Sequence, residues 1–184
     1  AGERAVYCGF LDEPPALTAT PRDCALVYLG AGSIPAGVAI RAGRELADAL
    51  GCDVYVTGVP EAVRISGGHT VVCAPRFDFA ELLPRTRVFV HHGGQNSMMD
   101  ALSYAVPQVL VPGRVFERQF NAEAVENARC GLTVRASQPA LIARAARRLV
   151  DEAALTSGIR GLRAELSSLG GTKRIVREVE KLVS

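Results

Sequence analysis

Short apolar runs alternate with helix-like stretches along most of this chain, and this alternation restricts the fold more than any other feature. Apolar strands that alternate with helices are typical of a parallel sheet whose two faces are both covered. The sequence therefore predicts an α/β fold, a Rossmann-like open parallel sheet with helices on both faces. The expected strands are 24–30, 52–58, 69–75, 87–94, 107–113 and 131–134, and the expected helices are 35–51, 95–105, about 118–130 and 139–151.

The first residues of the chain do not follow this alternation. Residues 1–22 contain three prolines and show neither a helical nor an alternating period. They are predicted to be a linker arm from a preceding half of a longer protein. Residues 23–184 are predicted to be one domain, which is an ordinary size for a domain.

Beyond the last expected strand, two helices are predicted at 158–170 and 172–184. The second helix has an apolar stripe at helical spacing, which requires a partner surface. The sequence leaves open whether this stripe packs on its own domain or on the preceding half. The stripe consists of Ile175, Val176, Val179, Leu182 and Val183.

Composition excludes several classes of protein. The net charge is +2 and the basic residues are dispersed, so a nucleic-acid-binding surface is not expected. The 5 cysteines are odd in number and show no CxxC spacing, which favours reduced thiols and a cytoplasmic location. No apolar run approaches the roughly 18 residues that a membrane span needs. No clustered set of metal-binding side chains is visible, so neither a metal nor a cofactor is expected.

The segment HHGGQNSMMD, at 91–100, lies where an expected strand turns into an expected helix. In an open parallel sheet, ligands bind beyond the carboxyl ends of the strands. The start of a helix offers unpaired N–H groups and a partial positive charge, which favour an anion such as phosphate. His92 and the first helical turn can add side-chain donors, and Asp100 lies on the same helical face as Asn96, one turn along. This set suits a nucleoside diphosphate. The alternative is a tight turn followed by an ordinary capped helix.

Two other strand ends carry polar residues. The segment YLGAGS, at 28–33, ends in Ser33, whose hydroxyl can reach a phosphate on the neighbouring strand. The segment 111–125 passes from a strand end to Glu117, Arg118 and Asn121. Taken alone, the second segment is equally well explained as a solvated helix start.

These three stretches, in this order, resemble the C-terminal, donor-binding half of family-one glycosyltransferases, one half of a GT-B fold. The motifs are VYLGAGS, CAPRFDFAELLPRTRVFVHHGGQNSMMDAL and AVPQVLVPGRVFERQFNA. The resemblance implies a ribose-binding role for Asp100 and a place beside the transferred sugar for Glu117 and Arg118. Arg118 replaces a glutamine that is common in the family, so the identity of the sugar stays open. The residues that match the phosphate contacts are His92, Gly94, Asn96, Ser97 and Ser33.

The base-binding segment of the family falls on residues 73–76. Cys73 stands where plant members have a tryptophan that stacks on the base. Arg76 and Phe77 are therefore the candidates for contacts with the base.

The resemblance implies an inverting transfer of a sugar from a UDP- or dTDP-sugar to a small-molecule acceptor such as a natural product. The acceptor site and the catalytic base are expected in a missing N-terminal domain or a partner chain, so no catalytic residue is assigned here. As an isolated domain the chain is expected to be inactive. The alternatives are a stand-alone donor subunit of a two-chain or lipid-linked glycosyltransferase, a nucleotide-sugar epimerase, and a nucleotide-sugar-binding domain without catalysis.

Overall fold

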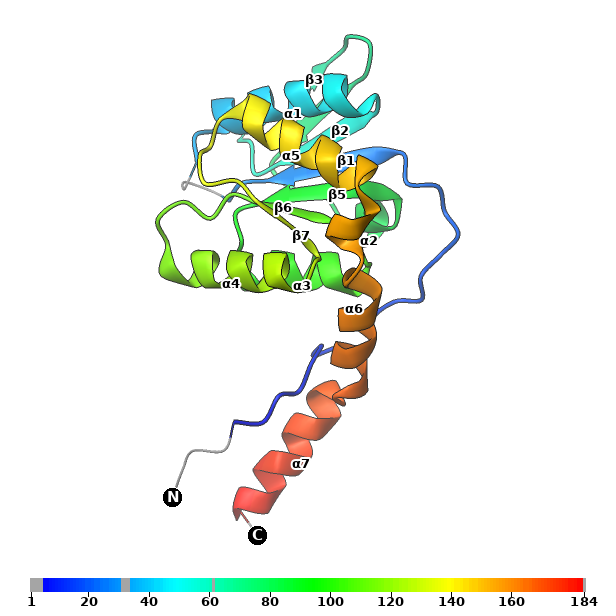
Figure 1. Ribbon diagram of the computed structural model, residues 1–184, viewed down its shortest axis with the longest axis vertical. Coiled ribbons are helices and arrows are strands. Elements are labelled where there is room, and N and C mark those ends of the chain that lie inside the picture. Colours follow the sequence, from blue (N-terminus) through cyan, green and yellow to red (C-terminus); the bar gives the residue numbers. More distant parts are fainter. Residues whose placement is uncertain (1–4, 31–33, 61, 184) are drawn as a thin grey trace.

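The computed structural model describes residues 5–30, 34–60 and 62–183. In these residues one mostly parallel sheet has strand order β3-β4-β2-β1-β5-β6-β7, and only β3 is antiparallel to its neighbour. The predicted α/β fold is confirmed (Figure 1). The strands are β1 (Cys24–Tyr28), β2 (Asp53–Thr57), β3 (Val63–Ile65), β4 (Val71–Ala74), β5 (Thr86–His91), β6 (Gln108–Leu110) and β7 (Gly131–Thr133).

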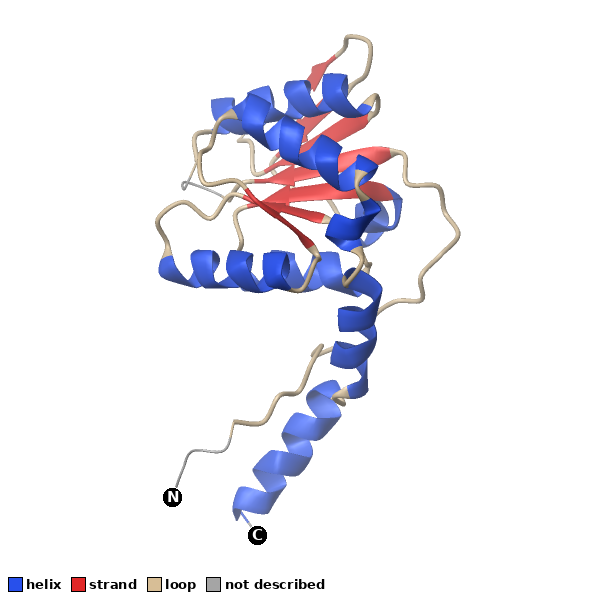
Figure 2. Cartoon of the chain, viewed as in Figure 1, coloured by secondary structure: helices blue, strands red, loops and turns tan. Residues whose placement is uncertain are grey.

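Helices cover both faces of the sheet, as predicted (Figure 2). One face carries α1 and α5, and the other carries α2, α3 and α4 (Figure 1). The helices are α1 (Ala36–Leu50), α2 (Phe79–Leu82), α3 (Gln95–Ser103), α4 (Phe116–Asn127), α5 (Pro139–Asp151), α6 (Ile159–Ser168) and α7 (Gly171–Val183), with 3-10 turns η1 (Leu83–Arg85) and η2 (Ala153–Thr156).

The sheet strands are apolar because both of their faces are buried. Val54 and Val56 of β2 and Val88 and Val90 of β5 are all 0% exposed, and they pack beneath α1 and α5. On the other face, Phe89 is fully buried under α2 and α3. Burial of this apolar area is the main contribution to folding free energy.

The arm that precedes β1 is packed against the C-terminal helices. Residues 5–22 contain no helix or strand, but Phe10 is only 7% exposed and lies in an apolar cluster with Leu102 and Ile159. Backbone hydrogen bonds join Gly171 to Cys8 and Thr172 to Leu11. The arm therefore follows α6 and the start of α7 (Figure 1).

Most of the apolar stripe of α7 is not covered by the rest of this domain, although Ile175 is half-buried. No residue of α7 is buried, and Leu182 and Val183 are 85% and 82% exposed. The helix extends away from the sheet (Figure 1). Of the two surfaces that the sequence left open, its own domain leaves Val176, Val179, Leu182 and Val183 exposed.

Candidate functional site

The candidate site lies where β1 and β5 run side by side. The helix that follows β1 is on one face of the sheet and the helix that follows β5 is on the other, so the chain leaves the carboxyl ends of these two strands toward opposite faces (Figure 1). Such a point is where open α/β sheets bind ligands. A backbone hydrogen bond joins the two strand ends here, because the N–H of His92 donates to the Tyr28 carbonyl, with 3.2 Å between the atoms.

The ring of His92 fits between two glycines of different loops. A Cβ on Gly94 would lie 2.5 Å from Nε2 of His92, and a Cβ on Gly30 would lie 3.2 Å from Nδ1. The other side of the ring meets Tyr28 edge-on, with 5.3 Å between the ring centroids. Burial lowers the pKa of His92, and the positive charge of Arg118 lowers it further. The ring is therefore neutral at neutral pH in the free protein.

The first turn of α3 is open to an anion. Gly94 is the N-cap residue, and no side chain caps this end of the helix. The leading N–H groups thus keep their capacity to donate, and the helix dipole adds roughly half a positive elementary charge. The Asn96 side chain is exposed here, whereas Ser97 is only 6% exposed. The structure brings His92, Gly94 and Asn96 together at this point, while Ser97 lies largely beneath the turn.

Asp100 lies one turn further along α3 and is half-buried. Burial raises the pKa of its carboxyl group. Within the described ranges, no side chain or backbone N–H donates a hydrogen bond to this carboxylate. A half-buried acceptor without a donor suits a ligand that brings hydroxyl groups.

Glu117 and Arg118 come from the first turn of α4 and approach the same site. Their charges act on His92 in opposite directions, since Arg118 lowers and Glu117 raises the pKa of that ring. The Arg118 carbonyl also lies close to Gly93, where a Cβ would be 3.0 Å from the oxygen. The structure thus places both predicted sugar-binding residues close to His92 and Gly93.

The residues predicted to bind the base lie two strands away. Arg76 and Phe77 follow β4, which is separated from β1 by β2. Arg76 is exposed, whereas the ring of Phe77 is half-buried and stands edge-on to Tyr55, with 5.4 Å between centroids. Ser33, the remaining predicted phosphate contact, lies outside the described residues.

The sequence analysis assigned no role in the site to three polar residues that are buried beside the turn into α3, namely His91, Gln108 and Asn121. Their side chains are 0%, 0% and 5% exposed. The available signal was weak, because a single polar residue at the end of an apolar run is commonly a loop residue. Only the fold shows that His91 and Asn121 meet the backbone of Gly93 and that Gln108 contacts the ring of His91.

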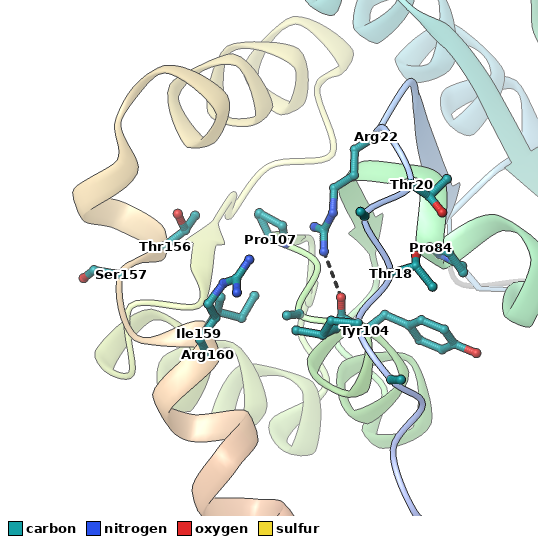
Figure 3. A pocket seen from close by; sticks show the side chains of 14 residues that line it. Thr18, Thr20, Arg22, Pro84, Tyr104, Pro107, Thr156, Ser157, Ile159 and Arg160 are labelled. Carbon is teal, nitrogen blue, oxygen red and sulfur yellow. Dashed lines mark hydrogen bonds between the residues drawn. The ribbon is translucent and has the colours of Figure 1, made fainter.

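A separate pocket of about 480 Å³ lies at the opposite edge of the sheet (Figure 3). Its lining includes Arg22, Pro84 and Pro107, which come just before or at the amino ends of β1, β5 and β6. Arg22 donates a 2.8 Å hydrogen bond to the Tyr104 carbonyl there. This pocket is therefore distinct from the site that contains His92.

The described residues contain neither a metal-binding cluster nor a helix that could span a membrane. In ranges 5–30, 34–60 and 62–183, no group of three or more His, Cys, Asp or Glu side chains is arranged to hold a metal ion. Across the same part of the chain, no helix is long and apolar enough to cross a membrane.

Relatives with known activity share this architecture. The chain is 26% identical over 186 residues to the 10-deoxymethynolide desosaminyltransferase of Streptomyces venezuelae, covering 98% of this chain and 43% of that enzyme. The crystal structure of the calicheamicin glycosyltransferase CalG4 superposes with a TM-score of 0.78 and 25% identity, covering 96% of this chain and 46% of CalG4. The Streptomyces glycosyltransferase SsfS6, complexed with thymidine diphosphate, gives a TM-score of 0.69 and 27% identity, covering 96% of this chain and 47% of SsfS6.

The match to a family model covers most of the chain. Residues 53–182 match the C-terminal domain of erythromycin biosynthesis protein CIII-like proteins. The chain covers less than half of the length of the curated relatives it matches, for example 26% and 43% of two of them. The resemblance to the donor-binding half of family-one glycosyltransferases is thereby confirmed, and this chain belongs to the family of erythromycin biosynthesis protein CIII-like C-terminal domains.

Proposed function

We propose that this chain is the donor-binding half of an inverting glycosyltransferase that uses a dTDP- or UDP-sugar. One observation carries the proposal. The carboxyl ends of β1 and β5 bring together His92, the glycine turn at 93–94 and the uncapped start of α3. Asp100 lies one turn further along the helix as an acceptor for ribose hydroxyls. The thymidine diphosphate bound by SsfS6 supports dTDP as the first ligand to test.

The chemistry follows from where negative charge develops. During transfer, the bond between the anomeric carbon and the diphosphate oxygen breaks while an acceptor oxygen bonds to the opposite face of the sugar. The leaving diphosphate gains negative charge, which the N-terminus of α3 and the His92 ring stabilise. Glu117 and Arg118 flank the position of the sugar. We propose that a second domain or a partner chain binds the acceptor, which we infer to be a small molecule, and supplies the base.

Titration calorimetry with dTDP and with UDP, in the presence of a chelator, tests this proposal. We expect at least one diphosphate to bind without added metal, because the start of α3 already offers N–H donors and a partial positive charge to the phosphates. A folded sample that gives no heat with either ligand up to about millimolar concentration would contradict the proposal.

A further inference from the structure

The peptide backbone of Gly93 is held on both sides by buried side chains. Its N–H donates to Nδ1 of His91, with 3.1 Å between the atoms, and its carbonyl accepts from Nδ2 of Asn121 at 2.9 Å. His91 is the last residue of β5 and Asn121 lies in α4, so the turn into α3 is attached to two separate elements. Gly93 has a φ of +85°, a conformation that glycine adopts without strain.

The same contacts fix the tautomer of His91. The Gly93 N–H needs a lone pair on Nδ1, so the single ring proton of the neutral imidazole is on Nε2. That Nε2–H then donates to Oε1 of Gln108, with 2.9 Å between the atoms. Protonation at Nδ1 would place two hydrogens face to face and break the bond to Gly93. Burial keeps the ring neutral, because it lowers the pKa of His91 to about 4.

A contribution to stability does not explain why a glutamine amide is buried at position 108. Its side chain is fully buried, and within the described ranges its Nε2 has no hydrogen-bond partner. A buried amide with an unsatisfied donor costs free energy relative to an apolar side chain of similar size. The remaining contact of its amide is the one to His91. Gln108 therefore serves to orient that ring.

We propose that Gln108, His91 and Asn121, here called the Gly93 clamp, are positioning residues for the diphosphate of the donor. The clamp fixes the turn so that the His92 ring and the first N–H groups of α3 face one phosphate group. None of the three residues touches the ligand. This inference rests on the proposed function, since it assigns the clamp to the proposed diphosphate-binding part of that site.

Binding of thymidine and of dTDP by four variants of the full chain tests the clamp. His91→Leu removes the acceptor for the Gly93 N–H, and Asn121→Asp replaces the donor to the Gly93 carbonyl by an oxygen. Each is expected to weaken dTDP binding by ~10-fold while thymidine changes by less than about twofold, because only the phosphate contacts depend on the turn. His91→Asn is expected to recover most of the dTDP affinity, since its Oδ1 can accept from the same N–H.

Thr86→Val is the matched control. Thr86 is fully buried at the other end of β5 and donates a 2.8 Å hydrogen bond to the Leu82 carbonyl. Its replacement should lower stability while the ratio of dTDP to thymidine affinity stays at the wild-type value. Nitrogen-15 NMR of the His91 ring is an independent readout on the unmodified protein, and a proton on Nε2 is expected.

The outcomes separate the two proposals. Failure of the wild-type protein to bind dTDP or UDP overturns the proposed function, and with it the assignment of the clamp to a donor. Wild-type binding with unchanged dTDP affinity in His91→Leu and Asn121→Asp overturns the clamp alone. Equal losses of thymidine and dTDP affinity in these variants also overturn the clamp. A proton on Nδ1 of His91 overturns it as well, and the NMR measurement that detects this proton uses the wild-type protein.

Discussion

Nδ1 of His92 lies 3.4 Å from the carbonyl oxygen of Tyr28, at the meeting point of β5 and β1. A carbonyl oxygen only accepts hydrogen bonds, so Nδ1 carries the ring proton. In the neutral ring Nε2 then has a lone pair. A phosphate oxygen has only lone pairs as well, so contact between the two needs a second proton on the ring.

Binding of a nucleotide sugar should therefore take up a proton. The pKa of His92 is lowered in the free protein by burial and by Arg118, and a bound diphosphate must raise it. Uptake occurs between these two pKa values, so affinity falls as pH rises through the window, by at most about tenfold per pH unit. Calorimetry with dTDP-glucose in buffers of different ionisation enthalpy measures the uptake, because the phosphates of a nucleotide sugar do not titrate there.

His92→Gln is the control for this prediction. A glutamine amide donates a hydrogen bond without taking up a proton. The variant should bind dTDP-glucose with little dependence on pH over the same window. Zero proton uptake by the wild-type protein would mean that His92 does not contact the phosphates through Nε2.

The elements that the sequence predicted well are those with strong local signals. α1 begins after Pro35 and ends before Gly51, which has a left-handed φ of 60°. The sequence places its bounds within a residue or two for this reason. By contrast, β3 was missed because it has only three residues and lies at the edge of the sheet, where Val63 is 39% exposed. Neither apolar alternation nor a continuous apolar run marks such a strand.

The start of α4 shows a second limit. The sequence predicted it at about residue 118, whereas the helix begins at Phe116. Phe116 and Phe120 are 82% and 64% exposed, so the apolar residues at this end do not mark the buried face. The bounds of a helix can be predicted from apolar periodicity only where the apolar residues face the core.

The candidate site divides in the same way. Asn96 and Asp100 both lie in α3, and their relation follows from the geometry of a single helix. The Gly93 clamp joins residues from β5, β6 and α4, and their convergence depends on strand order and on the packing of α4. No local pattern in the sequence contains that information.

Substitution of His92 and of Asp100 should give opposite patterns of ligand affinity. His92→Ala is expected to weaken UDP binding by roughly 10- to 100-fold and leave uridine almost unchanged, because a charge-assisted hydrogen bond to phosphate is lost. Asp100→Ala is expected to weaken uridine and UDP by similar factors, since the ribose hydroxyls lose their acceptor. Calorimetry with both ligands measures the two ratios. If neither variant changes affinity, the two residues are an ordinary turn residue and a solvated helix residue.

Gly94→Ala should impair the site without unfolding the protein. Gly94 has a φ of −66°, which alanine adopts freely, but the added Cβ would lie 2.5 Å from Nε2 of His92. The ring must move away from the helix start, so dTDP affinity is expected to fall by ~10-fold while the melting temperature changes little. Gly161→Ala is the control, because a Cβ there meets nothing within 4 Å and alanine favours a helix. Equal dTDP affinities for the two variants would show that the His92 ring does not need this space.

Stability should depend on pH through His91, with a sign that follows from its burial. The pKa of His91 is lowered from 6.5 to about 4, chiefly because the fully buried ring cannot be charged without loss of solvation, and nearby His92 opposes charging further. As pH falls below 6.5, His91 becomes protonated in the unfolded chain, whereas in the folded chain it becomes protonated only at about pH 4. The free energy of unfolding therefore decreases across this window by about 1.4 kcal/mol per pH unit, on the order of 3 kcal/mol in total. His91→Asn keeps an acceptor for the Gly93 N–H but does not titrate, so its stability should decline less as pH falls. Urea unfolding of both proteins across the window measures the difference in their free energies of unfolding. The other titrating groups contribute equally to the two proteins and cancel in this difference. Parallel profiles for the two proteins would mean that His91 is hydrated and charges in the folded state.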